Sequence, residues 1–214
     1  MNAHTERLVI TGPTGELACA VDTPAAGVPA RGLALLCHPH PLHGGTLDNK
    51  VVQTLARAAV QCGWRAVRFN FRGVGGSGGA WDAGRGEVDD ALAAIAHFRA
   101  AGEPLLLGGF SFGGFVASQA ARRLAEAGTP AAQLVLVGPA VVNFEVAPVP
   151  AHTLVVHGEA DDVVPLAAVL DWARPQALPV TVLPGAGHFF HGLLPTLRQI
   201  VVGTLQAQAA AVPA

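Results

Sequence analysis

The sequence predicts an α/β protein with a mostly parallel, doubly wound sheet of eight strands and an antiparallel hairpin at the N-terminal end. Short apolar runs bounded by Gly and Pro alternate along the chain with longer segments of helical spacing. Runs such as Leu33–Cys37 and Leu134–Val137 are apolar throughout, which is typical of parallel strands buried on both faces. The turn around Pro13–Gly15 is too short for a parallel crossover, so the first two strands are expected to pair as a hairpin.

Each predicted strand is an apolar run whose ends are marked by turn-forming or polar residues. In chain order these runs are Leu8–Thr11, Leu17–Val21, Gly32–Cys37, Ala66–Asn70, Leu105–Phe110, Leu134–Gly138, Thr153–His157 and Val180–Leu183. The predicted helices are the longer segments in which Ala, Leu and Val recur at helical spacing. They are Asn49–Cys62, Glu87–Ala100, Phe112–Ala127, Leu166–Ala173 and Leu194–Ala210.

Length and composition favour one domain. The 214 residues are 51% hydrophobic and 13% charged, and a chain of this length can bury roughly 70% of the surface it exposes when unfolded. Because no repeat or boundary is visible, residues 1–214 are expected to form a single domain, with residues 1–6 and about 208–214 as frayed tails. The sequence does not distinguish a monomer from a homodimer.

Charge and hydropathy limit the kinds of partner that the protein can have. The formal net charge is −2 and the Lys and Arg residues are scattered, which argues against nucleic acid and anionic lipid as partners. No apolar run reaches the roughly 18 residues that would cross a membrane. Met1–Leu8 is polar and lacks the apolar core of a signal peptide, so the protein is expected in the cytoplasm.

The three cysteines are odd in number and widely spaced, which does not indicate a disulfide framework.

Two stretches match the G-x-S-x-G pattern of a serine nucleophile, Gly109–Gly113 and Gly75–Gly79. The turn that exposes such a serine needs a strand before it and a helix after it. Ser111 has an apolar run on one side and a predicted helix on the other, whereas Ser77 lies among further glycines. The sequence therefore predicts that Ser111 is the nucleophile and that Ser77 belongs to a loop.

A serine nucleophile needs a base within hydrogen-bond reach and a third group that orients the base. Asp161 and Asp162 follow the seventh predicted strand, and His188 follows the eighth after a flexible glycine turn. Catalytic groups of open α/β sheets gather at these strand ends. His188 is preferred as the base over His191, which is expected at the site entrance or the start of the last helix. The position of the carboxylates leaves Asp161 and Asp162 as alternatives.

The His-rich segment His38–His43 has the spacing of an H-x-H-x-D-H zinc motif. Leu42 replaces the aspartate and two prolines interrupt the segment, so neither a metal nor another cofactor is predicted. The segment leaves the third strand on the side of Ser111 and is expected to supply one backbone N–H to an oxyanion hole. Since proline cannot donate, the donor is His40 or Leu42, with His40 preferred, and it acts together with the N–H of Phe112.

Several stretches carry a family resemblance, and they cover nearly the whole chain: His38–Pro41, Gly44-Gly45, Asp48–Lys50, Phe69–Gly75, Gly109–Gly114, Gly158–Asp161 and Gly185–His188. In these the sequence is similar to the α/β-hydrolase superfamily, and specifically to a small bacterial group with His-Pro-His-Pro after the third strand. The resemblance implies the α/β-hydrolase fold. It also implies Asp161 as the triad acid, because the acid commonly lies three residues after a strand-end glycine and before a Val-Val-Pro run.

The resemblance also bears on the cap and on the substrate. The superfamily usually inserts its cap after the sixth strand, but here only Pro139–Ala151 follows Gly138, which is too short for a helical cap. The expected function is that of a serine hydrolase, foremost a carboxylesterase that acts on small or short-acyl esters through an acyl-enzyme. A peptidase or thioesterase with the same triad is the alternative, followed by a non-catalytic binding protein. The residues expected to line the substrate pocket are Leu42, His43, Phe110, Val141, Phe144 and Phe189.

Overall fold

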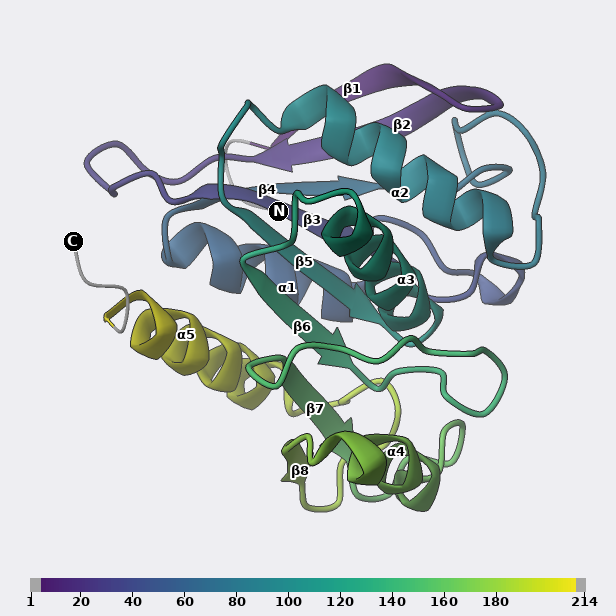
Figure 1. Ribbon diagram of the computed structural model, residues 1–214, viewed down its shortest axis with the longest axis vertical. Coiled ribbons are helices and arrows are strands. Elements are labelled where there is room, and N and C mark those ends of the chain that lie inside the picture. The colour runs from purple at the N-terminus through teal and green to yellow at the C-terminus, as the bar shows by residue number, and fades with distance from the viewer. Residues whose placement is uncertain (1–4, 211–214) are drawn as a thin grey trace.

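The computed structural model describes residues 5–210 and places eight strands in one sheet, in the order β1-β2-β4-β3-β5-β6-β7-β8 (Figure 1). The strands are β1 (Thr5–Gly12), β2 (Gly15–Asp22), β3 (Gly32–Cys37), β4 (Trp64–Phe69), β5 (Leu105–Phe110), β6 (Gln133–Val137), β7 (Leu154–Gly158) and β8 (Val180–Leu183). β1 pairs antiparallel with β2, β2 pairs antiparallel with β4, and the remaining pairs are parallel. The predicted fold class and its N-terminal hairpin are confirmed.

Helices cover both faces of the sheet. The α-helices are α1 (Lys50–Gln61), α2 (Arg85–Phe98), α3 (Phe112–Glu126), α4 (Leu166–Ala173) and α5 (Leu194–Ala210), and the short 3-10 turns are η1 (Pro41–His43) and η2 (Arg174–Gln176). α1 and α5 pack on one face, whereas α2, α3 and α4 pack on the other (Figure 1). Successive side chains of a strand point to opposite faces of the sheet, so each strand contributes to the hydrophobic cores on both faces. In β3, Leu35 faces α2 and α3 while Leu36 faces α1.

Boundaries differ from the sequence analysis at a few places. β1 begins at Thr5 instead of Leu8, because its polar first residues still pair along the whole length of β2. α2 begins at Arg85 instead of Glu87, because the Glu87 carboxylate accepts hydrogen bonds from the N–H groups of Asp82 and Gly84 and so caps the first turn. Of the segments expected to be frayed, Thr5 and Glu6 belong to β1 and residues 208–210 to α5, while residues 1–4 and 211–214 lie outside the described residues.

The connection between β6 and β7 decides how open the site is. Residues 138–153 form neither a helix nor a strand, so this connection builds no cap over the carboxyl ends of the strands. Between residues 5 and 210, no helix combines the length and apolar character needed to cross a membrane. The cysteines Cys19, Cys37 and Cys62 are free and buried.

β3, β5 and the first turn of α3 pack closely against one another. A Cβ added at Gly113 would lie 2.2 Å from the Cys37 carbonyl oxygen, and one added at Gly109 would lie 2.0 Å from the Gly113 carbonyl oxygen. Backbone cannot yield to such contacts as the end of a flexible side chain can. Glycine is therefore required at both positions for α3 to start directly against the sheet.

We predict that Gly113→Ala lowers the free energy of unfolding by about 2 kcal/mol or more, because the new methyl group overpacks the β3 contact. Gly203→Ala is the matched control: Gly203 also lies in a helix, but nothing lies within 4 Å of its added Cβ. That variant is expected to gain about 0.5–1 kcal/mol from helix propensity. Urea unfolding of both variants measures the difference, and a Gly113→Ala protein as stable as the wild type would show that the contact relaxes freely.

Candidate active site

The loops that follow β3, β5, β6, β7 and β8 meet at the carboxyl ends of these strands. This edge is where ligands of open α/β sheets bind. Ser111 lies at its centre, between the last residue of β5 and the first residue of α3. The loops on either side carry the other residues that the sequence analysis selected.

Ser111 occupies a sharp backbone turn. Its φ of 56° and ψ of −119° lie in a region that residues with a Cβ rarely adopt. The turn is held by the Ser111 N–H, which donates to the Val137 carbonyl of β6 at 2.9 Å. A serine on a strained turn from strand to helix presents its hydroxyl above the sheet edge.

A continuous chain of hydrogen bonds joins Ser111, His188 and Asp161. His188 Nε2 lies 3.0 Å from Ser111 Oγ, and His188 Nδ1 lies 2.7 Å from Asp161 Oδ2. All three residues are buried, with exposed fractions of 8% for Ser111, 6% for Asp161 and 4% for His188. Since an ionised carboxylate can only accept, Nδ1 donates to Asp161 and Nε2 is left to accept the serine proton.

The environment of Asp161 keeps it ionised. Burial by itself raises the pKa of Asp161, but the hydrogen bonds from His188 and from the Val164 N–H outweigh it and hold the pKa below its usual value. Oδ1 accepts from the N–H groups of Val163 at 3.0 Å and Val164 at 2.8 Å, which leaves Oδ2 for His188. Asp162 is exposed and makes no hydrogen bond to His188, so the structure joins Asp161, not Asp162, to the histidine.

The two alternative residues of the sequence analysis lie elsewhere. Ser77 is buried in its loop, where its hydroxyl donates to the Asn70 carbonyl at 2.8 Å and accepts from the Ala18 N–H at 3.0 Å. Both bonds hold the loop against β2 and the end of β4. His191 is exposed, and its ring contacts Phe189 with the centroids 5.9 Å apart.

The His-rich segment does not gather its rings into a set of ligands. Both nitrogens of His38 are engaged with backbone groups: Nδ1 donates to the Pro39 carbonyl at 2.7 Å and Nε2 accepts from the Phe71 N–H at 3.1 Å. Burial lowers the pKa of His38 to about 4, so the ring stays neutral. Within the described part of the chain, no three or more His, Cys, Asp or Glu residues lie in position to hold a metal ion.

The expected oxyanion hole has two alternative backbone donors in the His-rich segment, the N–H groups of His40 and Leu42. The Leu42 N–H donates to His40 Nδ1 at 3.2 Å and is therefore engaged. Among residues 5–210, the N–H groups of His40 and Phe112 have no acceptor. His40 and Phe112 line one cleft together with Ser111. Of the two alternatives, the structure leaves the His40 N–H available.

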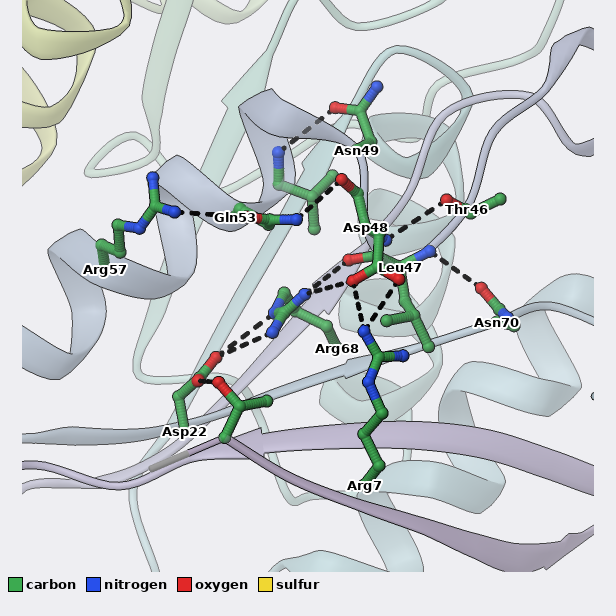
Figure 2. A network of polar contacts seen from close by, with 12 residues as sticks. Arg7, Asp22, Thr46, Leu47, Asp48, Asn49, Gln53, Arg57, Arg68 and Asn70 are labelled. Atoms are coloured by element: carbon green, nitrogen blue, oxygen red, sulfur yellow. Dashed lines mark hydrogen bonds and ion pairs between the residues drawn. The ribbon is translucent and has the colours of Figure 1, made fainter. Parts of the chain in front are cut away.

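A buried polar network fixes the loop that carries His40 (Figure 2). Arg68 of β4 donates to the Leu47 carbonyl at 2.7 Å, while Asn70 accepts from the Leu47 N–H at 2.8 Å. Arg68 is itself held by an ion pair with Asp22, 3.0 Å long and almost wholly buried. Asn49 then caps α1 by accepting from the Val51 N–H at 2.9 Å. Both backbone groups of Leu47, its N–H and its carbonyl, are thus bound to side chains at the end of β4.

Ser111 and His188 open onto a cleft of about 560 Å³. Its walls are formed by Pro39, His40, His43, Gly44, Gly45, Asn49, Ser111, Phe112, Ala140, Asn143, Phe144, Val163, Val164, His188 and Phe189. None of these residues is Asp, Glu, Lys or Arg. The cleft therefore combines aromatic and aliphatic surface with neutral hydrogen-bonding groups.

Three of the expected pocket residues, His43, Phe144 and Phe189, line this cleft, and three do not. Leu42 is 67% exposed on the outside of η1. Phe110 is fully buried beneath His188, with the rings 4.8 Å apart, and Val141 packs against the cluster around α4.

Sequence analysis missed several wall residues: Pro39, Gly44, Gly45, Asn49, Ala140, Asn143, Val163 and Val164. For Val163 and Val164 a signal was present, since they lie two and three residues after Asp161, the carboxylate that binds His188. Gly45 is required by a close approach, because a Cβ there would lie 2.0 Å from the Pro39 carbonyl oxygen.

The fold and this site together define a serine hydrolase of the α/β type without a cap. The family model described as serine aminopeptidase, S33, matches residues 40–151. A serine hydrolase without lid from Xanthomonas campestris is 36% identical, with a TM-score of 0.87 over 100% of this chain and 99% of that chain. A serine hydrolase homologue from Coxiella burnetii is 39% identical, with a TM-score of 0.81 over 94% and 97% of the two chains.

A protein of Rickettsia prowazekii (strain Madrid E) described as uncharacterized is 34% identical over 179 residues, which are 76% of this chain and 73% of that protein. The chain therefore belongs to the α/β-hydrolase superfamily, in the family whose model carries the S33 description.

The buried His38 ring predicts a pH-dependent stability. Its pKa in the folded protein is about 4, whereas an unfolded histidine has its ordinary value of 6.5. Between these values the unfolded chain binds a proton that His38 in the folded protein does not, so the contribution of His38 to stability is fully present above pH 6.5 and is lost as the pH decreases toward 4. A pKa difference of about 2.5 corresponds to about 3 kcal/mol.

We expect His38→Gln to be less stable than the wild type at pH 7.5 but to lose less stability between pH 6.5 and 4. His97→Gln is the control, because His97 is exposed. Urea unfolding at several pH values measures both slopes. An unchanged slope in His38→Gln would show that His38 does not govern this dependence.

Proposed function

We propose that the protein is a carboxylic-ester hydrolase that works through an acyl-enzyme, with Ser111 as nucleophile, His188 as base and Asp161 as the group that orients His188. One observation carries the proposal. The hydrogen-bond chain from Ser111 Oγ through His188 to Asp161 is complete, and it opens onto a cleft whose lining residues carry no permanent charge.

The geometry supports the following sequence of steps. His188 Nε2 takes the hydroxyl proton of Ser111 while Oγ attacks the ester carbonyl carbon. The carbonyl oxygen becomes an oxyanion, which the free N–H groups of His40 and Phe112 stabilise. His188 then gives its proton to the leaving alcohol oxygen, and the acyl group remains on Oγ. Water, deprotonated by His188, releases the acid and restores the hydroxyl.

Asp161 supports these steps through its charge and its direction. Its carboxylate keeps the Nδ1–H tautomer of His188 and stabilises the ring when it carries a proton. The lowered pKa of Asp161 keeps the carboxylate ionised at neutral pH. The catalytic histidine can therefore become a cation within a buried ion pair.

The lining of the cleft favours a neutral ester over a peptide with a free N-terminus. An aminopeptidase has to bind an α-ammonium group, and a buried cation needs a carboxylate partner. Asp161 is engaged with His188, and no Asp or Glu lines the cleft. A thioester remains chemically compatible with the same machinery, so substrate profiling separates it from an oxygen ester.

The open cleft favours small acyl groups. Because residues 138–153 build no cap, the walls end at exposed side chains such as Val163 and Phe189. A long acyl chain would extend beyond these walls into water, where each unburied methylene forgoes about 0.8 kcal/mol of binding. We infer that the natural substrate has a short or compact acyl part.

Ser111→Ala is expected to lower ester hydrolysis by at least about 10⁴-fold, because the variant has no nucleophile. Hydrolysis of p-nitrophenyl acetate measures the loss. Ser77→Ala is the matched control: it loses two structural hydrogen bonds and some stability, but keeps the turnover of the folded protein. Turnover that survives in purified Ser111→Ala would show that another residue performs the chemistry and would remove the basis of the proposal.

The substrate class predicts a profile. Across p-nitrophenyl esters from acetate to palmitate, each below its micellar limit, kcat/KM is expected to peak at short chains and to stop rising beyond them. Aminoacyl p-nitroanilides with a free α-ammonium should be hydrolysed no faster than the N-acetylated p-nitroanilides of the same amino acids, since the ammonium finds no carboxylate. A rise that continues to palmitate would contradict the short cleft, and efficient release of p-nitroaniline would favour the aminopeptidase.

A further inference from the structure

His157 is a buried titratable residue that the proposed reaction does not use. It lies near the carboxyl end of β7, is fully buried and does not line the cleft. Its Nε2 lies 2.9 Å from the Val164 carbonyl oxygen and 3.5 Å from Asp161 Oδ2. Its Nδ1 has no hydrogen-bond partner within the described residues.

The state of this ring follows from its neighbours. The Val164 carbonyl can only accept, so Nε2 carries the hydrogen and donates it. Nδ1 is then a bare lone pair in a buried place without a donor. Burial lowers the pKa of His157 and outweighs the hydrogen bond to Val164 and the charge of Asp161, both of which raise it. The ring is therefore neutral when the site works.

This arrangement is not the most stable choice for the core. An unsatisfied buried nitrogen costs stability that an apolar side chain of similar volume would not lose. The contribution of His157 must then come from the bond that it does make. That bond holds the Val164 carbonyl, which belongs to the turn that carries Asp161.

The hydrogen bond from His157 to Val164 fixes the turn, and the turn sets the direction of the Asp161 carboxylate. Val164 is held on both sides, because its N–H donates to Asp161 Oδ1 and its carbonyl accepts from His157. Oδ1 is thereby fixed by the turn, and Oδ2 is left facing His188 Nδ1 at 2.7 Å. Release of the Val164 carbonyl would let the turn, and the carboxylate with it, rotate away from His188.

We propose that His157 is a positioning residue for the triad: its Nε2–H holds the Val164 carbonyl and so aims the Asp161 carboxylate at His188. The proposal rests on the proposed function of Asp161 and His188, but its structural content concerns the position of the carboxylate alone. His157 touches neither substrate nor the reacting atoms. Its effect is therefore expected in turnover and in the Asp161–His188 hydrogen bond, and not in substrate binding.

A matched pair of substitutions tests the bond. In His157→Gln the side-chain amide nitrogen reaches the place of Nε2 and can still donate to Val164, whereas in His157→Asn it reaches only the place of Nδ1. Both variants bury a neutral amide, so they differ chiefly in reach. We expect His157→Asn to lower kcat by about 10- to 100-fold with KM within about twofold of the wild type. His157→Gln should keep kcat within about threefold of the wild type.

A spectroscopic readout makes the test independent of the substrate. The proton in the short Nδ1 to Oδ2 hydrogen bond should give a low-field ¹H NMR resonance in the wild type. It is expected to persist in His157→Gln and to shift or broaden away in His157→Asn, and the rate of fluorophosphonate labelling should fall in parallel. If the wild type hydrolyses no ester, the proposed function fails, while the resonance still reports whether His157 positions Asp161.

Three results would overturn the inference. In the first, folded His157→Asn keeps the wild-type kcat and the wild-type resonance. In the second, His157→Asn and His157→Gln lose both equally, which would show that the reach of the side-chain amide to Val164 does not matter. In the third, His157→Asn no longer folds while His157→Gln does. Circular dichroism and thermal melts of both variants identify the third result, which would make the bond a support of the fold alone.

Discussion

The close contact between the first turn of α3 and the ends of β3 and β5 governs the site. Gly113 lies against the Cys37 carbonyl, and Gly109 lies against Gly113, so the chain has to reverse sharply between them. The residue in that reversal is Ser111, which takes a φ of 56°. Such strain is stable only where surrounding packing fixes it, and here the strained turn places Ser111 and Phe112 on the wall of the same cleft. The other groups of the site are arranged around this fixed point.

Those groups lie on loops, and buried side chains in the strands or directly after them hold two of these loops in place. His38, directly after β3, holds the Pro39 carbonyl beside the His40 N–H, and Arg68 of β4 holds Leu47 further along the same loop. His157 of β7 holds the Val164 carbonyl in the turn of Asp161. In each case a donor in a strand, or directly after one, engages a backbone carbonyl of a loop. The loops can then present polar groups to an open cleft without a cap to order them.

The fold could be predicted from the sequence because the strand signals are local: buried parallel strands read as unbroken apolar runs, and a short turn forces a hairpin. Ser111 and His188 could be selected because chain order and strand ends constrain them strongly, whereas only the family resemblance favoured Asp161 over Asp162. The cleft walls could not be predicted as well, since they depend on side-chain directions in loops. Phe110 ends a strand but points beneath His188, and the role of the Leu42 N–H is decided by the ring of His40.

The proposed mechanism requires that Ser111 is activated by His188 under the control of Asp161. Site mapping tests it most directly: the protein is labelled with a fluorophosphonate, digested, and the adduct located by peptide mass spectrometry. One adduct is expected, on Ser111, and it should form much more slowly in Asp161→Asn and at the wild-type rate in Asp162→Asn. An adduct on another residue, no adduct in the wild type, or equal rates in the two Asn variants would contradict it.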